Sequence, residues 1–201
     1  MSRVRNDLYQ VANRIPLGSH VLDLGCGEGE LLRWLFTNRA CSGTGVEHEP
    51  GSVLKAMESG VPVLDLDIDT QLDLFAPDSY DYVVLSRTLQ AIRRPDIALK
   101  QMRKIAPRLI VTMPNFGFWR NRTRLLSGHM PQSKDLPFNW YETPNLHHST
   151  LVDMPPLFEV AQLRVAGRVP LAESGKILPL GSVFPNLRAG SAIYVLERIG
   201  S

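Results

Sequence analysis

Residues 21–32 read VLDLGCGEGELL, a short apolar run followed by three glycines (Gly25, Gly27 and Gly29) and the first residues of a helical pattern. An apolar run that ends in a glycine-rich turn is typical of a strand leading into a helix. Glycine tolerates positive φ and has no Cβ, so such a turn lets a ligand approach the backbone at the amino end of the helix. The stretch therefore predicts a strand, a turn and a helix that together cradle a ligand.

The chain on either side repeats this order of elements. Strand-length apolar runs lie at residues 20–25, 43–48, 61–67, 80–86 and 108–114, and segments of helical spacing lie at 29–39, 49–60 and 96–105. Strands that alternate with helices predict an α/β fold with a mostly parallel sheet and helices on both faces. A length of 201 residues favours a single domain over residues 1–201.

The alternation breaks after Pro114. An insertion at about residues 115–150 is rich in aromatic, proline and arginine residues, and it is too long to be a simple connection. After it we expect a helix at 151–162, a strand at 163–171, a loop at about 171–189 to which no role is assigned, and a last strand at 191–199.

Composition indicates an ordinary globular protein, with 44% hydrophobic and 21% charged residues. A formal net charge of +2 does not point to a nucleic-acid or membrane partner. Residues 1–16 are basic but are followed by no apolar segment, and the longest apolar runs are far too short to span a bilayer. We therefore expect a cytoplasmic protein without nucleic-acid or membrane partners.

Cysteine and histidine positions predict neither a disulfide framework nor a metal site. Cys26 and Cys41 are too few for the first, and the histidines lack zinc-ligand spacing. Cys26 lies inside the glycine turn, where a small packed side chain is favoured over a reactive thiol.

Two phosphate-binding patterns fit the glycine turn poorly. A dinucleotide fingerprint reads G-x-G-x-x-G, but Glu30 stands where its third glycine would fall. The carboxylates of Glu28 and Glu30 would also compete with a pyrophosphate for the positive end of the helix. The pair Gly175-Lys176 lacks the other residues of a P-loop. The turn therefore favours a less anionic ligand.

Acidic residues at the next two strand ends suit an adenosine. Glu47 follows the glycines by about twenty residues, where a carboxylate accepts hydrogen bonds from two ribose hydroxyls. Asp67 ends the third run, where it could accept a hydrogen bond from an adenine amine while the Ile68 N–H meets a ring nitrogen. Asp23, inside the first strand, could hold the turn or bind an ammonium group.

These stretches resemble the motifs of class I S-adenosylmethionine (SAM)-dependent methyltransferases over about Leu8–Pro114. DLGCGEG is similar to their first motif, GVEHEP and LDLDI to their ribose-binding and adenine-binding strand ends, and YDYVVLSRTLQAI to their fourth strand. The resemblance implies a Rossmann-like fold of seven strands with an antiparallel last strand. It also implies SAM or S-adenosylhomocysteine as the cofactor, held by Asp23, Gly25, Cys26, Gly27, Gly29, Glu47, His48, Asp67, Ile68 and Ser86.

A narrower resemblance, over about Leu8–Asp153, includes the insertion. LSRTLQAIRRPDIAL, PNFGFWRNRTRLLSGHMP and LPFNWYETPNLHHSTLVD are similar to stretches of the methionine biosynthesis protein MetW family, although that family has a less basic residue where this chain has His148. The family has a methyltransferase fold and is associated with the homoserine O-acyltransferase step of methionine synthesis. The resemblance therefore implies a MetX-type homoserine O-acyltransferase as partner.

The insertion combines aromatic rings with guanidinium groups, a mixture enriched in lids and protein interfaces. We expect a partner or acceptor surface that includes Trp119, Arg120, Arg122, Trp140 and Tyr141.

No residue stands out as a catalytic base. Ser86 and Gln90, near the fourth strand, are poor bases, and the pair His147 and His148 lies in the insertion. The resemblance favours the first of two hypotheses, and the second is kept as the alternative. The chain either binds SAM and serves as a partner or activator of homoserine O-acyltransferase, or it is an active methyltransferase for an unknown small acceptor, because methyl transfer can proceed by positioning alone.

Overall fold

The computed structural model describes residues 4–179 and 183–200, and within them seven strands form one sheet. The strand order is β3-β2-β1-β4-β5-β7-β6, and β7 pairs antiparallel with both β5 and β6 while β1 to β5 run parallel. This confirms the predicted mostly parallel sheet and its antiparallel last strand. The strands are β1 (His20–Leu24), β2 (Ser42–Glu47), β3 (Val63–Asp65), β4 (Tyr82–Ser86), β5 (Arg108–Pro114), β6 (Leu163–Leu171) and β7 (Ser191–Arg198).

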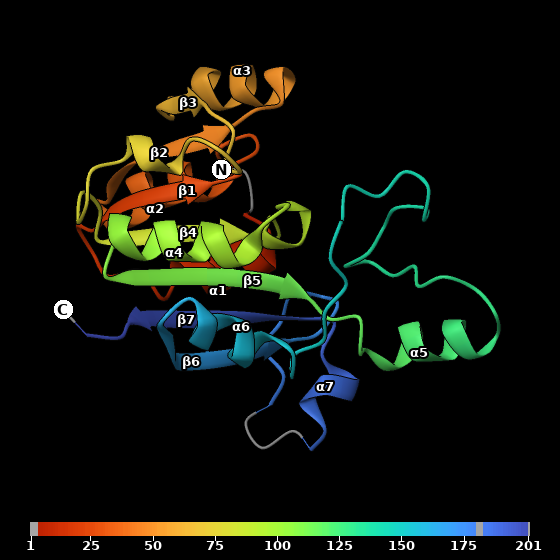
Figure 1. The fold of residues 1–201 in the computed structure, drawn as a ribbon. Coiled ribbons are helices and arrows are strands. Elements are labelled where there is room, and N and C mark those ends of the chain that lie inside the picture. Colours follow the sequence, from red (N-terminus) through yellow and green to blue (C-terminus); the bar gives the residue numbers. More distant parts are fainter. Residues whose placement is uncertain (1–3, 180–182, 201) are drawn as a thin grey trace.

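Helices cover both faces of the sheet, as predicted. Figure 1 shows α4 and α6 in front of the strands and α1 and α2 behind them. The helices are α1 (Asn6–Ala12), α2 (Glu30–Arg39), α3 (Pro50–Glu58), α4 (Pro95–Ile105), α5 (Trp119–Leu126), α6 (Met154–Val160) and α7 (Pro185–Arg188).

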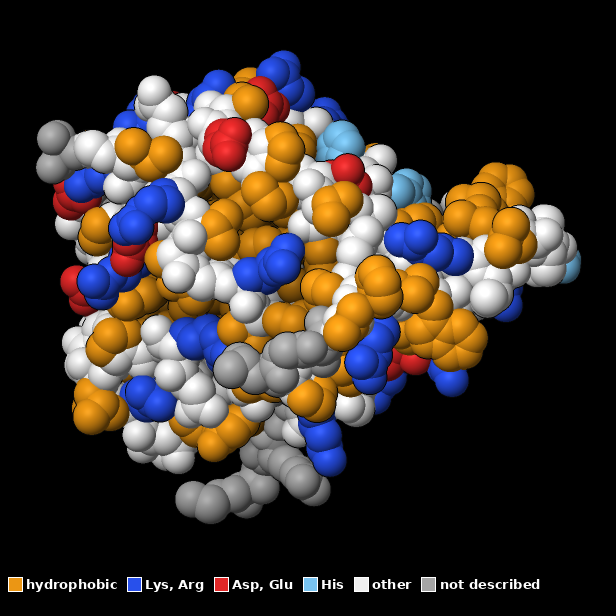
Figure 2. Space-filling model, turned by 90° about the horizontal axis from the view of Figure 1, so that it is seen from below, with side chains coloured by type: hydrophobic (Ala, Val, Ile, Leu, Met, Phe, Trp, Pro, Cys, Tyr) orange, Lys and Arg blue, Asp and Glu red, His pale blue; other side chains and the backbone are white. Residues whose placement is uncertain are grey.

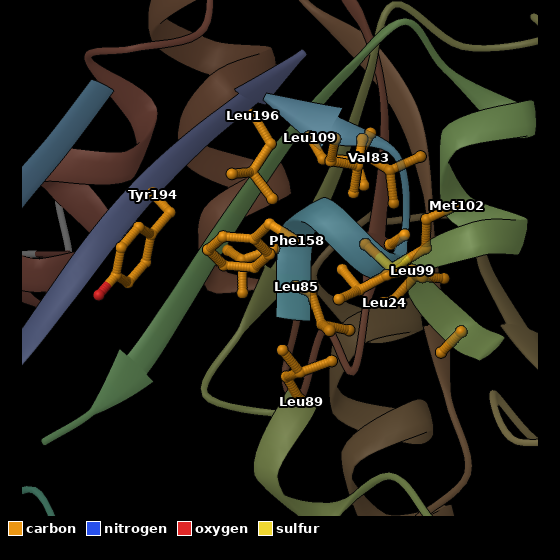
Figure 3. Close-up of a cluster of buried hydrophobic side chains, with 14 of the residues drawn as sticks. Leu24, Val83, Leu85, Leu89, Leu99, Met102, Leu109, Phe158, Tyr194 and Leu196 are labelled. Atoms are coloured by element: carbon orange, nitrogen blue, oxygen red, sulfur yellow. The ribbon is translucent and has the colours of Figure 1, made fainter. Parts of the chain in front are cut away.

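Two apolar layers result from the alternation of side chains along each strand. Leu22 and Leu85 point to the face covered by α4 and α6, whereas Val21 and Val84 point to the face covered by α1 and α2. Both layers are closed to bulk solvent, because the central strands are buried on both sides. Figure 3 shows the first layer, in which Phe158 of α6 packs with its ring centroid 5.1 Å from that of Tyr194 in β7.

Local structure differs from the sequence-based expectation at three places. Helix α1, which was not predicted, buries Leu8, Val11 and Ala12 beside α2. The third strand ends at Asp65, so Asp67 lies in the turn that follows it. The short helix α7 lies within the expected loop at about 171–189; residues 180–182 of that loop lie outside the described residues.

The insertion leaves the sheet at the carboxyl end of β5 and returns before α6. It contains α5 and a long irregular stretch with one isolated bridge between Ser133 and Leu136. The Phe116 N–H donates to the Ser149 carbonyl oxygen at 3.0 Å, which brings the two ends of the insertion together. Figure 1 shows α5 and the stretch after it projecting away from the sheet.

Buried Asn115 fastens the start of this insertion. Its Nδ2 donates to the carbonyl oxygens of Asn186 and Ala189, both at 2.8 Å, and its Oδ1 accepts from the Gly117 N–H at 2.9 Å. One amide therefore joins the end of β5, the beginning of the insertion and the α7 segment. Among the described residues, no helix is long and apolar enough to cross a membrane.

Candidate functional site

The glycine turn between β1 and α2 has the backbone that the sequence predicts. Gly25, Gly27 and Gly29 have φ values of 72°, 54° and 75°, a region that costs L residues energy. At Gly25 a Cβ would also lie 2.5 Å from Thr88 Oγ1, whereas at Gly27 it would meet nothing within 4 Å. The turn is therefore pressed against Thr88 on one side and open at Gly27.

A cavity of about 620 Å³ lies beside this turn. Its volume is within the usual range for small-molecule sites. The turn, the carboxyl end of β4, the start of α2, Arg5 just before α1, and α3 all contribute to its wall. The lining residues are Arg5, Leu8, Asp23, Gly25, Cys26, Gly27, Glu28, Glu30, Leu31, Arg33, Ser52, Ser59, Ser86, Arg87 and Thr88.

Asp23 is one of two strongly perturbed groups on this wall. Its side chain is buried, and its Oδ1 has no hydrogen-bond partner among the described residues. Burial raises the pKa of Asp23 to about 7; the nearby charge of Glu47 adds to this rise, and Arg5 opposes it. An unpaired buried carboxylate beside a cavity is poised to receive a cationic group, because such a partner would restore the interactions that burial removed.

Glu47, at the end of β2, holds the turn through its carboxylate. Glu47 Oε2 accepts from the Gly27 N–H at 2.9 Å, and Oε1 accepts from the His48 and Glu49 N–H groups at 2.8 and 3.0 Å. A carboxylate has about four acceptor positions, so roughly one remains for a ligand hydroxyl. Glu47 thus has a structural function besides the predicted ribose contact.

Five of the predicted contact residues are not among the residues that line this cavity, namely Gly29, Glu47, His48, Asp67 and Ile68. The exposed imidazole of His48 is 2.8 Å from Asp65 Oδ1, and this carboxylate raises the pKa of His48. The Asp67 carboxylate accepts from the Asp69 N–H at 2.9 Å and from the Thr70 hydroxyl at 3.1 Å, while Ile68 packs against the core. Adenine recognition by Asp67 and Ile68 therefore stays a prediction.

Cys26 and Ser86 line the cavity but differ in chemistry. Burial, together with the charges of Asp23 and Glu47, raises the pKa of the Cys26 thiol to about 12. Its Sγ packs so close to Gly45 that a Cβ there would lie 2.4 Å away. The Ser86 hydroxyl pairs with Thr112 Oγ1 at 3.2 Å. Neither group is activated as a nucleophile.

Sequence reasoning did not single out Arg5 and Arg87, two of the three arginines that line the cavity. Arg5 Nε lies 3.5 Å from Asp7, and the Arg5 N–H donates to Glu30 Oε1 at 2.7 Å. Arg87 directly follows β4 and has a φ of 58°, which is uncommon for a non-glycine residue. Arg87 could have been found from the sequence, because it lies one residue beyond the carboxyl end of the fourth strand. Arg5 could not, because its place at the cavity depends on α1, which the sequence analysis did not predict.

The predicted partner surface falls on two parts of the insertion. Trp119, Arg120 and Arg122 are on α5, and Trp140 and Tyr141 are in the following stretch with their rings 5.6 Å apart. Trp119 is 46% exposed, Trp140 70% and Tyr141 67%. Figure 2 shows hydrophobic side chains beside Lys and Arg side chains on the projecting part of the molecule.

The arginines of α5 already have partners within the chain. Arg120 pairs with Glu173 at 2.9 Å, and Arg122 Nε donates to the Gly117 carbonyl oxygen at 2.7 Å. Their guanidinium groups therefore hold α5 in place in addition to facing solvent.

A second, apolar cavity of about 170 Å³ lies inside the insertion. Its lining residues are Phe116, Met130, Pro131, Leu136, Phe138, Trp140, Thr143, Asn145 and His148. His148 packs edge-on against Phe116, and burial together with neighbouring His147 lowers the pKa of His148. A neutral imidazole thus forms part of an apolar wall.

The other candidate bases have structural partners. Gln90 is buried, its Nε2 donates to the Arg87 backbone carbonyl oxygen at 2.6 Å, and its backbone carbonyl oxygen accepts from the Leu146 and His147 N–H groups. In residues 4–179 and 183–200 no cluster of three or more His, Cys, Asp or Glu could hold a metal ion.

Comparisons with known proteins agree with this architecture. The family model described as "Methionine biosynthesis protein MetW" matches residues 5–196. The bifunctional methionine biosynthesis protein MetXA/MetW of Rhodopirellula baltica is 31% identical over 96% of the chain, which spans 32% of that relative's length.

Solved methyltransferases share the fold at low identity. A SAM-dependent methyltransferase of Thermotoga maritima, described as a possible histamine N-methyltransferase, has a TM-score of 0.71 at 16% identity, with 96% and 87% of the two chains covered. A SAM-dependent methyltransferase of Mesorhizobium loti has a TM-score of 0.69 at 15% identity, with 96% and 98% covered.

Proposed function

This chain belongs to the MetW family of methionine biosynthesis proteins, and from that premise we propose that it binds SAM and acts as a partner and activator of a homoserine O-acyltransferase. The observation that carries the partner role is the Rhodopirellula relative, whose name joins MetXA and MetW in one polypeptide. Two functions joined in one chain are held at high effective concentration, an arrangement that suits components acting together.

Features of the glycine turn and of the strand ends beside it support SAM as the ligand. The open face of Gly27 lets a ligand approach the backbone, Glu47 retains an acceptor position for a ribose hydroxyl, and the unpaired carboxylate of Asp23 suits an ammonium group. SAM has ribose hydroxyls that suit Glu47 and an ammonium group that suits Asp23. When bound it supplies an electrophilic methyl group, and the residues of the chain bind and orient it.

The apolar cavity of the insertion supports a docking role for that region. Its rim includes Met130, Phe138 and Trp140, which are 48%, 46% and 70% exposed. A volume near 170 Å³ is close to the roughly 150 Å³ apolar cavity that accepts benzene, so one apolar side chain of the acyltransferase fills it. Exposed aromatic residues around a pocket are typical of interface positions that contribute most to binding energy.

The test is to co-express the chain with the acyltransferase and to measure complex formation and acyltransferase rate. We expect Trp140→Ala to weaken the complex roughly 30-fold, the minimum loss at such a position, and Trp119→Ala to weaken it as well. Leu74→Ala is the matched control, because Leu74 is 66% exposed but lies outside the insertion. Full activation by both tryptophan variants would place the docking surface elsewhere, and a wild-type chain that neither binds nor activates would refute the partner role.

A second function, methyl transfer to a small acceptor, is favoured by the cavity volume, which is ample for a ligand and part of an acceptor. Two carboxylates that line the cavity are engaged as ion pairs, Glu28 with Lys55 at 2.5 Å and Glu30 with Arg5 at 3.9 Å. We therefore expect purified protein to produce S-adenosylhomocysteine slowly or not at all. Rapid production with a defined acceptor would favour the methyltransferase function over the activator function.

A further inference from the structure

We propose that Arg87 is shared between the ligand cavity and the insertion, so that the carboxylate of a bound SAM molecule competes with Asp135 for its guanidinium and loosens the insertion. This inference rests on the proposed binding of SAM. It assigns Arg87 as the residue that connects ligand occupancy to the docking region.

Arg87 joins three parts of the chain. Its Nε lies 3.0 Å from Asp7 Oδ2 in α1, and its Nη2 lies 2.6 Å from Asp135 Oδ1 in the insertion. Arg87 also lines both the large cavity and a neighbouring cavity of about 210 Å³ that Lys134 and Glu173 border. Arg87 thus lies between the ligand cavity and the part of the insertion that contains Lys134 and Asp135.

The backbone of Arg87 is held in an unusual conformation to achieve this. Arg87 has a left-handed φ of 58°, and a hydrogen bond from its N–H to the Thr112 side chain at 3.0 Å helps to hold this conformation. A strained backbone conformation persists only where the surrounding structure enforces it, and residues of this kind cluster at functional sites.

Burial raises the pKa of Asp135, and Arg87 opposes this rise by favouring the carboxylate form. The Asp135 side chain is 2% exposed, its Oδ2 has no hydrogen-bond partner among the described residues, and a Cβ on Gly190 would lie 2.3 Å from that oxygen. The carboxylate therefore packs tightly against Gly190, just before β7. Its ion pair with Arg87 offsets part of the free-energy cost of burying the charge. If the pair weakens, Asp135 gains by moving out to water, since an unpaired buried charge is strongly unfavourable.

The local charge count gives the direction of the effect. One guanidinium already faces the carboxylates of Asp7 and Asp135. The amino-acid carboxylate of SAM, reaching Arg87 from the cavity, would be a third anion on the same group. Asp7 keeps a second cation nearby, Arg5 at 3.5 Å, so Asp135 is the partner that is released.

The experiment measures hydrogen exchange of wild-type protein with saturating SAM or 5′-methylthioadenosine, which has the same nucleoside but no amino-acid group. The reporting amides are Ser133 and Leu136, which bond to each other's carbonyl oxygens at 3.0 and 3.1 Å, and the reference amide is Phe116. We expect SAM to accelerate exchange of the two reporting amides by roughly fivefold or more, the low end of typical coupling. Methylthioadenosine should leave it unchanged.

A second measurement follows because coupling is reciprocal: if bound SAM weakens the contact between Arg87 and Asp135, that contact must weaken SAM binding. Asp135→Asn removes the competing charge, so SAM should bind roughly fivefold tighter or more, with no such gain for methylthioadenosine. Glu173→Gln is the matched control, because Glu173 also holds the insertion, through Arg120 and the Lys134 N–H, but among the described residues no hydrogen bond or ion pair joins it to Arg87.

Unchanged exchange in wild type with SAM demonstrably bound would overturn the inference and leave the proposed cofactor intact. Equal SAM affinity in Asp135→Asn and Glu173→Gln would also overturn it. Absence of SAM binding to wild type would refute the cofactor proposal and the inference together.

Discussion

Replacing Asp23 with asparagine should remove a large pH dependence from the stability of the ligand-free protein. The pKa of Asp23 rises from 3.8 to about 7, chiefly because the carboxyl is buried. A carboxyl whose pKa is raised on folding stabilises the folded state at low pH, and that contribution is lost as the pH rises to the folded pKa. At about 1.4 kcal/mol per pKa unit, ionised Asp23 costs about 4 kcal/mol above pH 7.

The assay is urea unfolding of both proteins between pH 4 and pH 8. The asparagine amide brings its own constant cost of burial, so the informative quantity is the wild-type free energy of unfolding minus that of Asp23→Asn. This difference should fall by about 4 kcal/mol across the range, and most of the fall should occur between pH 4 and pH 7. Parallel stability curves that differ by a constant would refute the reasoning, because they would mean that Asp23 titrates alike in the folded and unfolded chain.

Three further predictions concern the turn and the core. Glu47→Ala should lower SAM affinity by roughly 1.5–3 kcal/mol in calorimetry, because it removes charge-assisted hydrogen bonds; Glu49→Ala, which removes the cap of α3, should leave affinity unchanged, and equal losses in both would count against the assignment. Gly27→Val should abolish detectable SAM binding, whereas Gly60→Val, at a similar φ of 78° and equally open, should reduce only the melting temperature; retained binding in Gly27→Val would remove the basis for a cradle at this turn. Phe158→Ala should cost roughly 3–5 kcal/mol in urea unfolding, because it leaves a cavity between α6 and the sheet, and a loss below 1 kcal/mol would show that the layer repacks.

The sequence predicted the sheet well because its central strands β1, β4 and β5 are buried on both faces and therefore appear as continuous apolar runs. The contacts of the candidate site were harder to predict. The spacing located Glu47 and Asp23, but the hydrogen bond from the Gly27 N–H to Glu47 depends on how two strand ends meet. Arg87 and Asp135 are 48 residues apart and come together only because the insertion folds back on the sheet edge. No local pattern reports such a pairing.

The meeting of the two insertion ends at the Phe116 to Ser149 hydrogen bond has an evolutionary consequence. A segment that starts and finishes at one point can grow, shrink or be exchanged without altering the order of the strands. The entropic cost is small, at about 0.6 kcal/mol for each doubling of loop length. Lineages carrying this fold can therefore change the surface that the insertion presents by rewriting one continuous stretch of gene, while the glycine turn is inherited unaltered.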